Sequence, residues 1–430
     1  MIIIGCGLHY QSKYHSVLET KGVKIALLID LKVNEEAIRA FFQNRTLKPQ
    51  RFLFLDEVHR NAVTVEKIES WVAEIDLSGV KKVLISTEPK ARKAYAIWAA
   101  RRGFDLFLDK PVTAFLSGDQ SDTLLSDFEE IERAGVRVVV SCERRAHLGY
   151  LWLKKYIDEQ KIPLTGIDIH FAGGVWKTLQ EYREVENHPF HYGYGILLHS
   201  GYHYVDLLVS LLSYNQSLIG KTSESLYALA SSPGVSTDEA ERFGEADFLM
   251  IGQSLKEGRA MVNFSMQLFG TSVSRRRSIE GGAKLEGRLR QEKVTLHFGH
   301  LCSIHVSSQP FKKLKDSPYE DFSVTIMNSP LLKGKQAVIR LDRKQISEMF
   351  PELPLEVTMN SFARQWQLSE FLEGRDGNSP LGSHRDTVAM LQKIYSTLRR
   401  PFPPRGGNQD DLLESRLLPF SMSQGRVSGI

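Results

Sequence analysis

The chain opens with Met1-Ile2-Ile3-Ile4-Gly5-Cys6-Gly7, an apolar run that ends in two glycines separated by one residue. The run predicts a buried strand, and the residues after it predict a helix. At such a junction the first glycine permits a tight turn, and the second lets the backbone approach a pyrophosphate at the helix N-terminus. Tyr10 occupies the third position of the G-x-G-x-x-G pattern, so the pattern is incomplete, and ordinary turns also carry G-x-G. We predict that Gly5, Gly7 and the adjoining Leu8 bind a dinucleotide.

Strand and helix patterns alternate through the first 145 residues. Further apolar runs lie at 24–29, 52–55, 83–86, 105–108 and 136–140, and helical patterns lie between them at 35–42, 65–75 and 91–102. Strands that alternate with helices imply right-handed crossovers and a parallel, doubly wound sheet. The sequence therefore predicts an N-terminal Rossmann domain of the α/β class.

An acidic residue ends the second predicted strand. Asp30 lies 25 residues after Gly5, where a carboxylate would accept hydrogen bonds from the adenosine ribose and repel a 2′-phosphate. A polar residue at a strand end also occurs without any ligand. Lys32, two positions on, could still tolerate the phosphate of NADP. We expect NAD as the cofactor, with NADP possible.

The pattern changes after about residue 150. A helical stretch at 150–160 leads to a strand at 165–171, a helical segment at 199–212, and longer strand-rich runs at 245–251, 259–268, 293–298 and 322–327. Helical periodicity returns at 361–372 and 387–398. We expect an α+β domain with a large, mostly antiparallel open sheet at 149–360. It would follow a Rossmann domain at 1–148 and precede C-terminal helices at 361–398 and a loosely attached, proline- and glycine-rich tail at 399–430.

Composition narrows the class of protein. The 430 residues are 42% hydrophobic with a formal charge of +4, from 55 basic and 51 acidic residues, and carry no long basic block. Nucleic acid is therefore not an expected partner. No run of about 18 apolar residues predicts a membrane span. Cys6, Cys142 and Cys302 are too scattered for a disulfide framework or a thiolate metal site, and the first apolar run is too short for a signal peptide. We expect a cytoplasmic protein without a metal site.

A lysine followed by proline ends the predicted strand at 105–108. Proline pushes the residue before it toward extended geometry, so Lys110 before Pro111 would present its ammonium group above the carboxyl end of the sheet. Ligands of doubly wound sheets bind at that edge. A surface lysine before a turn is the alternative interpretation of Asp109-Lys110-Pro111.

Several motifs occur together in an order that resembles one family. The 83–89 strand and turn with Thr87 and Glu88, Asp109-Lys110-Pro111, the segment 141–145, the helix within 193–206 and the stretch 276–285 resemble the motifs of the glucose–fructose oxidoreductase/inositol dehydrogenase (Gfo/Idh/MocA) family. Asp109 stands where that family usually has glutamate. The resemblance implies a Rossmann domain followed by an α/β domain, with the substrate between them over a nicotinamide. It also implies that Thr87, Glu88, Asp109 and Lys110 contact the cofactor.

Two histidines and an aspartate share one face of the predicted helix at 199–212. His199, His203 and Asp206 are spaced i, i+4, i+7. The family resemblance implies an aspartate and a histidine four residues apart at the substrate. His203 matches the histidine, whereas His199 replaces the aspartate. Histidine can take or give a proton at neutral pH, so we predict that His203 is the acid/base and that His199 orients or binds substrate. Lys110 would stabilise charge on the reacting oxygen.

Substrate contacts are expected from Arg144, Asp206 and an aromatic cluster before the helix. Trp176 and Tyr194 of that cluster could stack on a sugar ring, although the same residues could line a subunit interface of a homo-oligomer paired through the open sheet. We therefore predict an NAD(P)-dependent oxidoreductase acting on a secondary alcohol or ketone of a sugar, inositol or sugar derivative. A regulatory dinucleotide-binding protein and an NAD-dependent glycosidase are the alternatives.

A zinc hydrolase is disfavoured. His188, His191, His199 and His203 lie close in the sequence, but no H-E-x-x-H motif is present. Gly201, between the last two histidines, fits close packing of the helix on a cofactor better than placement of a metal ligand.

Overall fold

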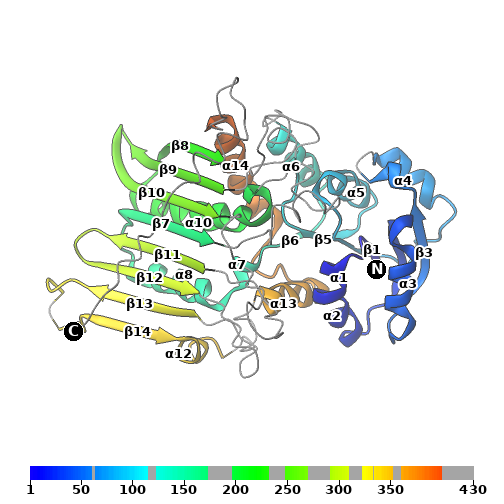
Figure 1. Cartoon of the computed structure of the whole chain (residues 1–430), viewed down its shortest axis with the longest axis horizontal. Coiled ribbons are helices and arrows are strands. Elements are labelled where there is room, and N and C mark those ends of the chain that lie inside the picture. Colours follow the sequence, from blue (N-terminus) through cyan, green and yellow to red (C-terminus); the bar gives the residue numbers. More distant parts are fainter. Residues whose placement is uncertain are drawn as a thin grey trace, which may run out of the picture.

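The computed structural model describes residues 1–60, 63–114, 123–172, 196–231, 247–269, 291–308, 322–332, 334–351 and 360–399. In these ranges the chain forms two β-sheets, each covered by helices, which lie side by side in Figure 1. Trp176, Tyr194, His188, His191 and the stretch 276–285 lie outside the described residues, as does the tail from residue 400.

The first sheet has the predicted Rossmann topology. Its strands follow the order β3-β2-β1-β4-β5-β6 and all pair in parallel, which is the order of dinucleotide-binding folds. The strands are β1 (Ile2–Ile4), β2 (Ile25–Leu31), β3 (Pro49–Leu55), β4 (Lys82–Ile85), β5 (Asp105–Asp109) and β6 (Val138–Ser141). The strand order reverses between β1 and β4, so the ligand-binding edge lies after Ile4 and Ile85.

Helices cover both faces of this sheet because successive side chains of each strand point to opposite faces. Ile3 and Phe107 pack with the helices of one face, whereas Ile4 and Leu108 pack with those of the other. The first face is covered by α1 (Leu8–Lys13), α2 (His15–Thr20) and α3 (Glu35–Gln43), and the second by α4 (Val65–Val72), α5 (Pro89–Arg101) and α6 (Thr123–Arg133).

The second sheet has nine strands and is mostly antiparallel, as predicted. Its order is β14-β13-β12-β11-β7-β10-β9-β8-β15, and only the pairs β7–β10 and β8–β15 are parallel. The strands are β7 (Gly166–Ala172), β8 (Ser223–Ser231), β9 (Asp247–Lys256), β10 (Arg259–Phe269), β11 (Gln291–Phe298), β12 (Cys302–Ser308), β13 (Phe322–Asn328), β14 (Val338–Asp342) and β15 (Leu398–Arg399).

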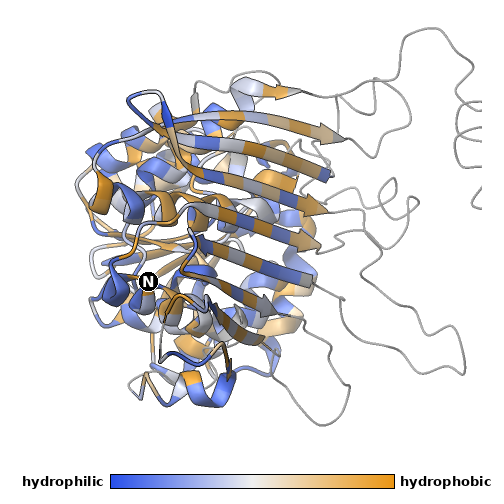
Figure 2. Ribbon diagram, turned by 90° about the vertical axis from the view of Figure 1, so that its left-hand side faces the viewer, coloured by the Kyte–Doolittle hydropathy of each residue, from blue (hydrophilic) through white to orange (hydrophobic). Residues whose placement is uncertain are grey.

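Helices lie on one face of this sheet, and no helix covers its other face in the part of the chain that the structure describes (Figures 1 and 2). Along β10, Phe264 and Met266 are buried under the helices, whereas Asn263 and Gln267 point outward and are exposed. The alternation is visible as changing colour along the strands in Figure 2. The helices on the covered face include α8 (Leu148–Gln160), α10 (Tyr202–Ile219) and α14 (Arg385–Thr397), while α12 (Arg343–Ser347) packs on α8 and β14.

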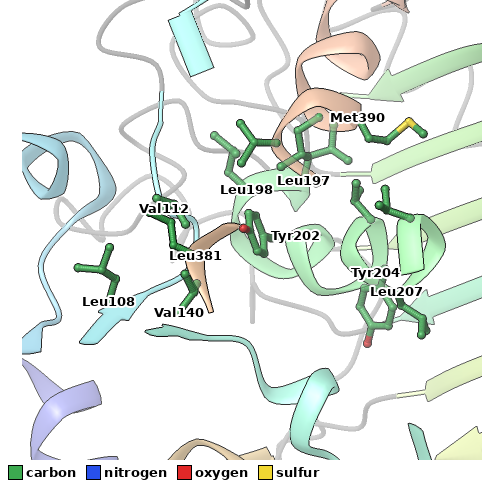
Figure 3. Packing of buried hydrophobic residues seen from close by; sticks show 14 of the residues in the cluster. Leu108, Val112, Val140, Leu197, Leu198, Tyr202, Tyr204, Leu207, Leu381 and Met390 are labelled. Carbon is green, nitrogen blue, oxygen red and sulfur yellow. The ribbon is translucent and has the colours of Figure 1, made fainter. Parts of the chain in front are cut away.

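One hydrophobic core joins the two sheets. Leu108 and Val140 of the first sheet belong to the same cluster as Tyr202 and Leu207 of α10 (Figure 3). Leu381, from the short 3-10 helix η6 (Leu381–His384), lies between them. No described helix is long and apolar enough to cross a membrane.

Near its C-terminal end the chain returns to the first sheet. Helix α13 (Asn360–Leu372) places Leu368 and Phe371 against the face that carries Phe107, and the Phe371 and Phe107 rings are 5.6 Å apart. Helix α14, by contrast, packs on α10 and α6. The two predicted C-terminal helices therefore join different parts of the molecule, and the domain boundaries stay a prediction.

Candidate active site

A cleft of about 570 Å³ lies at the carboxyl ends of β1, β4, β5 and β6 and extends to the start of α10. Most residues predicted to bind cofactor or substrate line it, although they come from distant parts of the sequence. These residues are Gly5, Gly7, Asp30, Thr87, Glu88, Asp109, Lys110, Arg144, His199 and His203.

The Gly5–Gly7 turn begins the cleft. Gly5 has φ of +88°, and a Cβ there would lie 2.6 Å from the Ser86 carbonyl oxygen, so this position requires glycine. A Cβ at Gly7 would meet no atom within 4 Å, so the turn is open at that point. Tyr10 is fully buried at the position of the third glycine. Helix α1 ends after six residues, at Lys13, and α2 continues in its place.

Asp30 is held rigidly at the same end. Its Oδ2 accepts a hydrogen bond from the Cys6 N–H at 2.5 Å, and its Oδ1 accepts from the Leu31 N–H at 2.7 Å and from Asn34 Nδ2 at 2.8 Å. The carboxylate is thereby fixed beside the Gly5–Gly7 turn. Lys32 does not line the cleft.

Thr87 and Glu88 follow β4 across the cleft. Arg60 donates to Glu88 Oε1 at 2.9 Å, and burial raises the pKa of Glu88. The Thr87 carbonyl accepts from Arg92 Nη2 at 2.5 Å, which ties this turn to helix α5. These contacts hold the predicted turn in place, and the turn forms one wall of the cleft.

Asp109 lies directly before Lys110, and both of its carboxylate oxygens are bound within the protein. Its two carboxylate oxygens accept hydrogen bonds from Tyr14 Oη and Ser86 Oγ. Burial opposes the charge of Asp109, but nearby His9 and Arg92 and these two hydrogen bonds together hold its pKa below the usual value. Both oxygens are therefore engaged within the protein, and a contact of Asp109 with the cofactor stays a prediction.

Lys110 lies in the cleft with an altered pKa. Burial and, to a smaller extent, Arg364 lower the pKa of its ammonium group to about 7, although Glu143 and Asp109 oppose the shift. At neutral pH the side chain therefore exchanges between the ammonium and amine forms. Such a group can stabilise an oxyanion or relay a proton.

His203 is buried at the far end of the cleft, with 3% of its surface exposed. Its Nδ1 lies 3.3 Å from Cys142 Sγ, and its Nε2 lies 3.5 Å from Glu143 Oε1. Burial lowers the pKa of His203 well below the usual value, with Lys110 and Arg364 acting in the same direction. The imidazole is therefore neutral near pH 7 and can accept a proton.

His199 lies one turn earlier, in the π-helical turn η4 (Leu197–Gly201) that precedes α10. It is half-buried in the cleft, and its Nδ1 lies 3.0 Å from Ser200 Oγ. The predicted packing of Gly201 on a cofactor is wrong, because a Cβ at Gly201 would lie 2.7 Å from Leu268 Cδ1 of β10. Gly201 instead permits the helix to approach the second sheet.

The structure does not bring Asp206 into the cleft where a substrate contact was predicted for it. Asp206 is 2% exposed and does not line the cleft. Arg145 donates to both of its oxygens, at 2.7 and 2.6 Å, and Thr387 Oγ1 donates to Oδ1 at 2.7 Å. Burial opposes its charge, but Arg145 and His384 hold its pKa well below the usual value. Asp206 therefore joins α10 to α7 (Glu143–Ala146) and α14.

Arg144 does line the cleft, but its guanidinium group already has partners. Nη2 donates to Glu292 Oε2 at 2.6 Å and to Tyr204 Oη at 3.1 Å. Leu8 is 83% exposed, and its side chain is not part of the cleft lining. The roles of Arg144 in substrate binding and of Leu8 in cofactor binding stay predictions.

Several cleft residues were not predicted from the sequence, among them Glu143, His9 and Arg364. Glu143 belongs to the 141–145 motif, from which only Arg144 was predicted to contact a ligand. His9 and Arg364 contact one another, with Arg364 Nη1 2.9 Å from His9 Nε2. Arg364 lies on α13, far from any motif, and only tertiary packing brings it here. Among the described residues, no three His, Cys, Asp or Glu side chains are grouped as metal ligands would be.

No protein-family model and no curated protein matches the sequence. Solved structures do share the fold. Levoglucosan dehydrogenase in complex with NADH and levoglucosan is 12% identical with a TM-score of 0.59, covering 92% of this chain and 96% of its own. The WlbA dehydrogenase of Bordetella pertussis, in complex with NADH and UDP-GlcNAcA, is 15% identical with a TM-score of 0.56, covering 92% of this chain and 95% of its own.

A third structure binds the phosphorylated dinucleotide. The 3-ketoreductase KijD10 of Actinomadura kijaniata, in complex with NADP, is 11% identical with a TM-score of 0.57, covering 94% of this chain and 98% of its own. The likeness extends over both sheets, so the architecture expected from the sequence motifs is confirmed. The chain therefore shares the fold of these solved NAD(P)-bound dehydrogenases and reductases, with a parallel Rossmann sheet and a second, mostly antiparallel sheet.

Proposed function

We propose that the protein is an NAD(P)-dependent oxidoreductase that transfers a hydride between nicotinamide and a secondary alcohol or ketone of a sugar, inositol or sugar derivative. One observation carries the proposal. A single cleft joins the Gly5–Gly7 turn and Asp30 at one end to Lys110 and a buried His203 at the other. Its volume of about 570 Å³ is in the range of small-molecule and cofactor sites.

The residues at the two ends suit different parts of the reaction. A bound nicotinamide supplies the acceptor for the hydride that leaves the carbinol carbon. His203 takes the hydroxyl proton as the carbonyl forms, and returns it in the reverse direction. Lys110 hydrogen-bonds the reacting oxygen and stabilises its developing negative charge. His199 and Arg144 border the same space and bind or orient the substrate.

NAD is the preferred cofactor in this proposal. The Asp30 carboxylate, fixed by three hydrogen bonds, suits the ribose hydroxyls and repels a 2′-phosphate. Arg60 also lines this end of the cleft, but it is paired with Glu57 and Glu88. We therefore expect tighter binding of NADH than of NADPH in fluorescence titrations.

Incubation with NAD or NADP and a panel of sugars, inositols and sugar nucleotides tests the function. The proposal predicts that at least one panel member reduces the cofactor, as followed by the absorbance of the reduced nicotinamide. Release of an aglycone without net reduction would instead identify a glycosidase. Binding of dinucleotide without turnover of any panel member would favour a regulatory protein.

The open face of the second sheet provides a surface for a second copy of the chain. Tyr227 and Ile251, paired between β8 and β9, are 51% and 53% exposed on that face, and Met327 and Val338 form a similar exposed pair. If two copies of the chain packed with these faces together, the pairs would be buried and their apolar surface removed from water. We expect a dimer in light scattering that Ile251→Glu converts to a monomer. Leu331→Glu, in an exposed turn outside the sheet, should not change the mass; an unchanged mass for Ile251→Glu would exclude this interface.

A further inference from the structure

A buried carboxylate lies beside His203 that neither the motifs nor the proposed roles account for. Glu143 is the first residue of α7, directly beyond the carboxyl end of β6, and is 4% exposed. It lines the cleft together with Lys110, His199 and His203. A buried carboxylate stays ionised without a large cost to folding only when a cation pairs with it.

Two arginines provide that pairing. Arg364 Nη2 binds Glu143 Oε2, and Arg144 Nη1 lies 3.8 Å from Oε1. His203 Nε2 also lies near Oε1, at 3.5 Å, which is longer than an ordinary hydrogen bond. Arg364 thus holds one oxygen while the other faces the imidazole. The carboxylate is positioned for a stronger contact once His203 carries a proton.

The other carboxylates of the region are committed elsewhere. Asp109 is bound by Tyr14 and Ser86, and Asp206 lies outside the cleft with Arg145. Asp30 and Glu88, the latter paired with Arg60, lie at the dinucleotide end. His199 occupies the helix position where the family resemblance led us to expect an acid. Among the described residues, Glu143 is therefore the carboxylate that the cleft places beside the acid/base histidine.

We propose that Glu143, rather than a residue of the α10 helix, is the carboxylate partner of His203 in proton transfer. The inference rests on the proposed oxidoreductase function. In the oxidation direction, the carbinol C–H bond breaks, and a bound nicotinamide would take up the hydride with its electron pair. The O–H proton passes to His203 Nε2, and the carbon–oxygen double bond forms. The new N–H donates a hydrogen bond to Glu143, which stays a carboxylate until His203 loses the proton to solvent.

The charges around His203 determine how the carboxylate acts. Lys110 after β5, Arg144 on α7 and Arg364 on α13 all disfavour the imidazolium, as does burial, whereas Glu143 favours it. Cys142 Sγ contacts the opposite ring nitrogen and also donates to Asp206 at 3.4 Å. Removing the negative charge of Glu143 therefore leaves His203 a weaker base. Arg364 acts as a positioning residue because it orients Glu143.

Glu143→Gln tests the proposal, since it removes the charge with little change of shape. We expect kcat to fall about tenfold or more, with the dissociation constant for NADH within about twofold of wild type. We also expect the acidic limb of the kcat/KM profile to move to lower pH by about one unit, because the His203 pKa falls.

Asp127→Asn is the matched control, because Asp127 is a buried carboxylate outside the cleft, paired with Lys93 at 2.5 Å. It should lower the melting temperature and leave the pH profile unchanged.

Glu143→Asp keeps the test informative if the glutamine variant folds poorly. Because this variant retains the charge, its acidic limb should stay close to that of wild type even where kcat falls. If the wild-type chain turns over and Glu143→Gln keeps its kcat and pH profile, Glu143 has no part in proton transfer and only this inference is lost. If the wild-type chain oxidises or reduces no member of the panel, the proposed function is lost and this inference with it.

Discussion

Lys110 shows how a single residue can oppose the stability of the fold that contains it. Burial lowers the pKa of its ammonium group to about 7, so the charged form is less stable in the folded protein than in the unfolded chain. Asp109 and Glu143 reduce the penalty without removing it. A cation kept in a partly buried position at a stability cost is typical of a functional site.

Replacing this lysine should separate activity from stability. Lys110→Met should lower kcat by about 10²-fold, because the oxyanion loses its stabilising partner. The same variant should melt at a higher temperature than wild type at pH 6, where the wild-type lysine is charged in both states. The folded pKa lies below the unfolded value, so the penalty is complete below about pH 7 and fades as the pH rises toward 10.5. Thermal unfolding at several pH values measures this trend.

Lys93 offers the matched control. Although burial lowers its pKa, the ion pair with Asp127 raises the pKa above the usual value, so this lysine stabilises the fold. Lys93→Met should therefore melt at a lower temperature and keep its kcat. If Lys110→Met kept wild-type turnover, Lys110 would have no part in the mechanism, whatever the melting temperature of the variant.

Among the strands, those that are buried on both faces were the easiest to predict from the sequence. Strands of the first sheet are covered on both faces, so they appear in the sequence as continuous apolar runs and all six were predicted. In the second sheet β8, β12, β14 and the two-residue β15 were not predicted; Leu398 of β15 was expected at the end of a helix. Their outward positions carry polar residues such as Ser225 and Ser303, and β14 is exposed along much of its length, so the apolar signal is weak.

The helix that carries His199 and His203 was predicted from the sequence, but the π-helical turn at its start was not. The π-helical turn η4 has a wider repeat than an α-helix and ends at Gly201, which packs on Leu268. His199 and His203 still share the cleft, whereas Asp206 is held away from it by Arg145. Spacing along the sequence indicates a common helix face, but partners from α7 and α14 decide which side chains reach a ligand.

The two histidines of this helix should differ in kinetic role. His203→Asn should lose roughly 10²–10⁴ in kcat while it still binds cofactor, because proton transfer is lost. His199→Asn should mainly raise KM, since this histidine binds or orients substrate. Steady-state kinetics with titration of NADH measures both effects. An active His203→Asn together with an inactive His199→Asn would show that the two roles are reversed.

At the scale of the whole molecule, the site depends on segments that no local pattern connects. Gly5, Asp30, Lys110 and His203 follow strands or lie in motifs, so the sequence alone identifies them as candidates. Arg364 is different, because it reaches the cleft only where α13 packs back onto the first sheet beside α1 and α7. The pairing of Glu143 with Arg364, and the carboxylate it presents to His203, could be recognised only in the folded chain.

The central claim is that the two ends of the cleft together carry a hydride from a carbinol carbon to a nicotinamide. A substrate from the panel that carries deuterium on the reacting carbon tests this directly, with the products followed by mass spectrometry. We predict that the deuterium appears in the reduced nicotinamide, in equal amount to the ketone formed. Ketone formation with the deuterium lost to water, or no reduced nicotinamide from any panel member, would contradict the account.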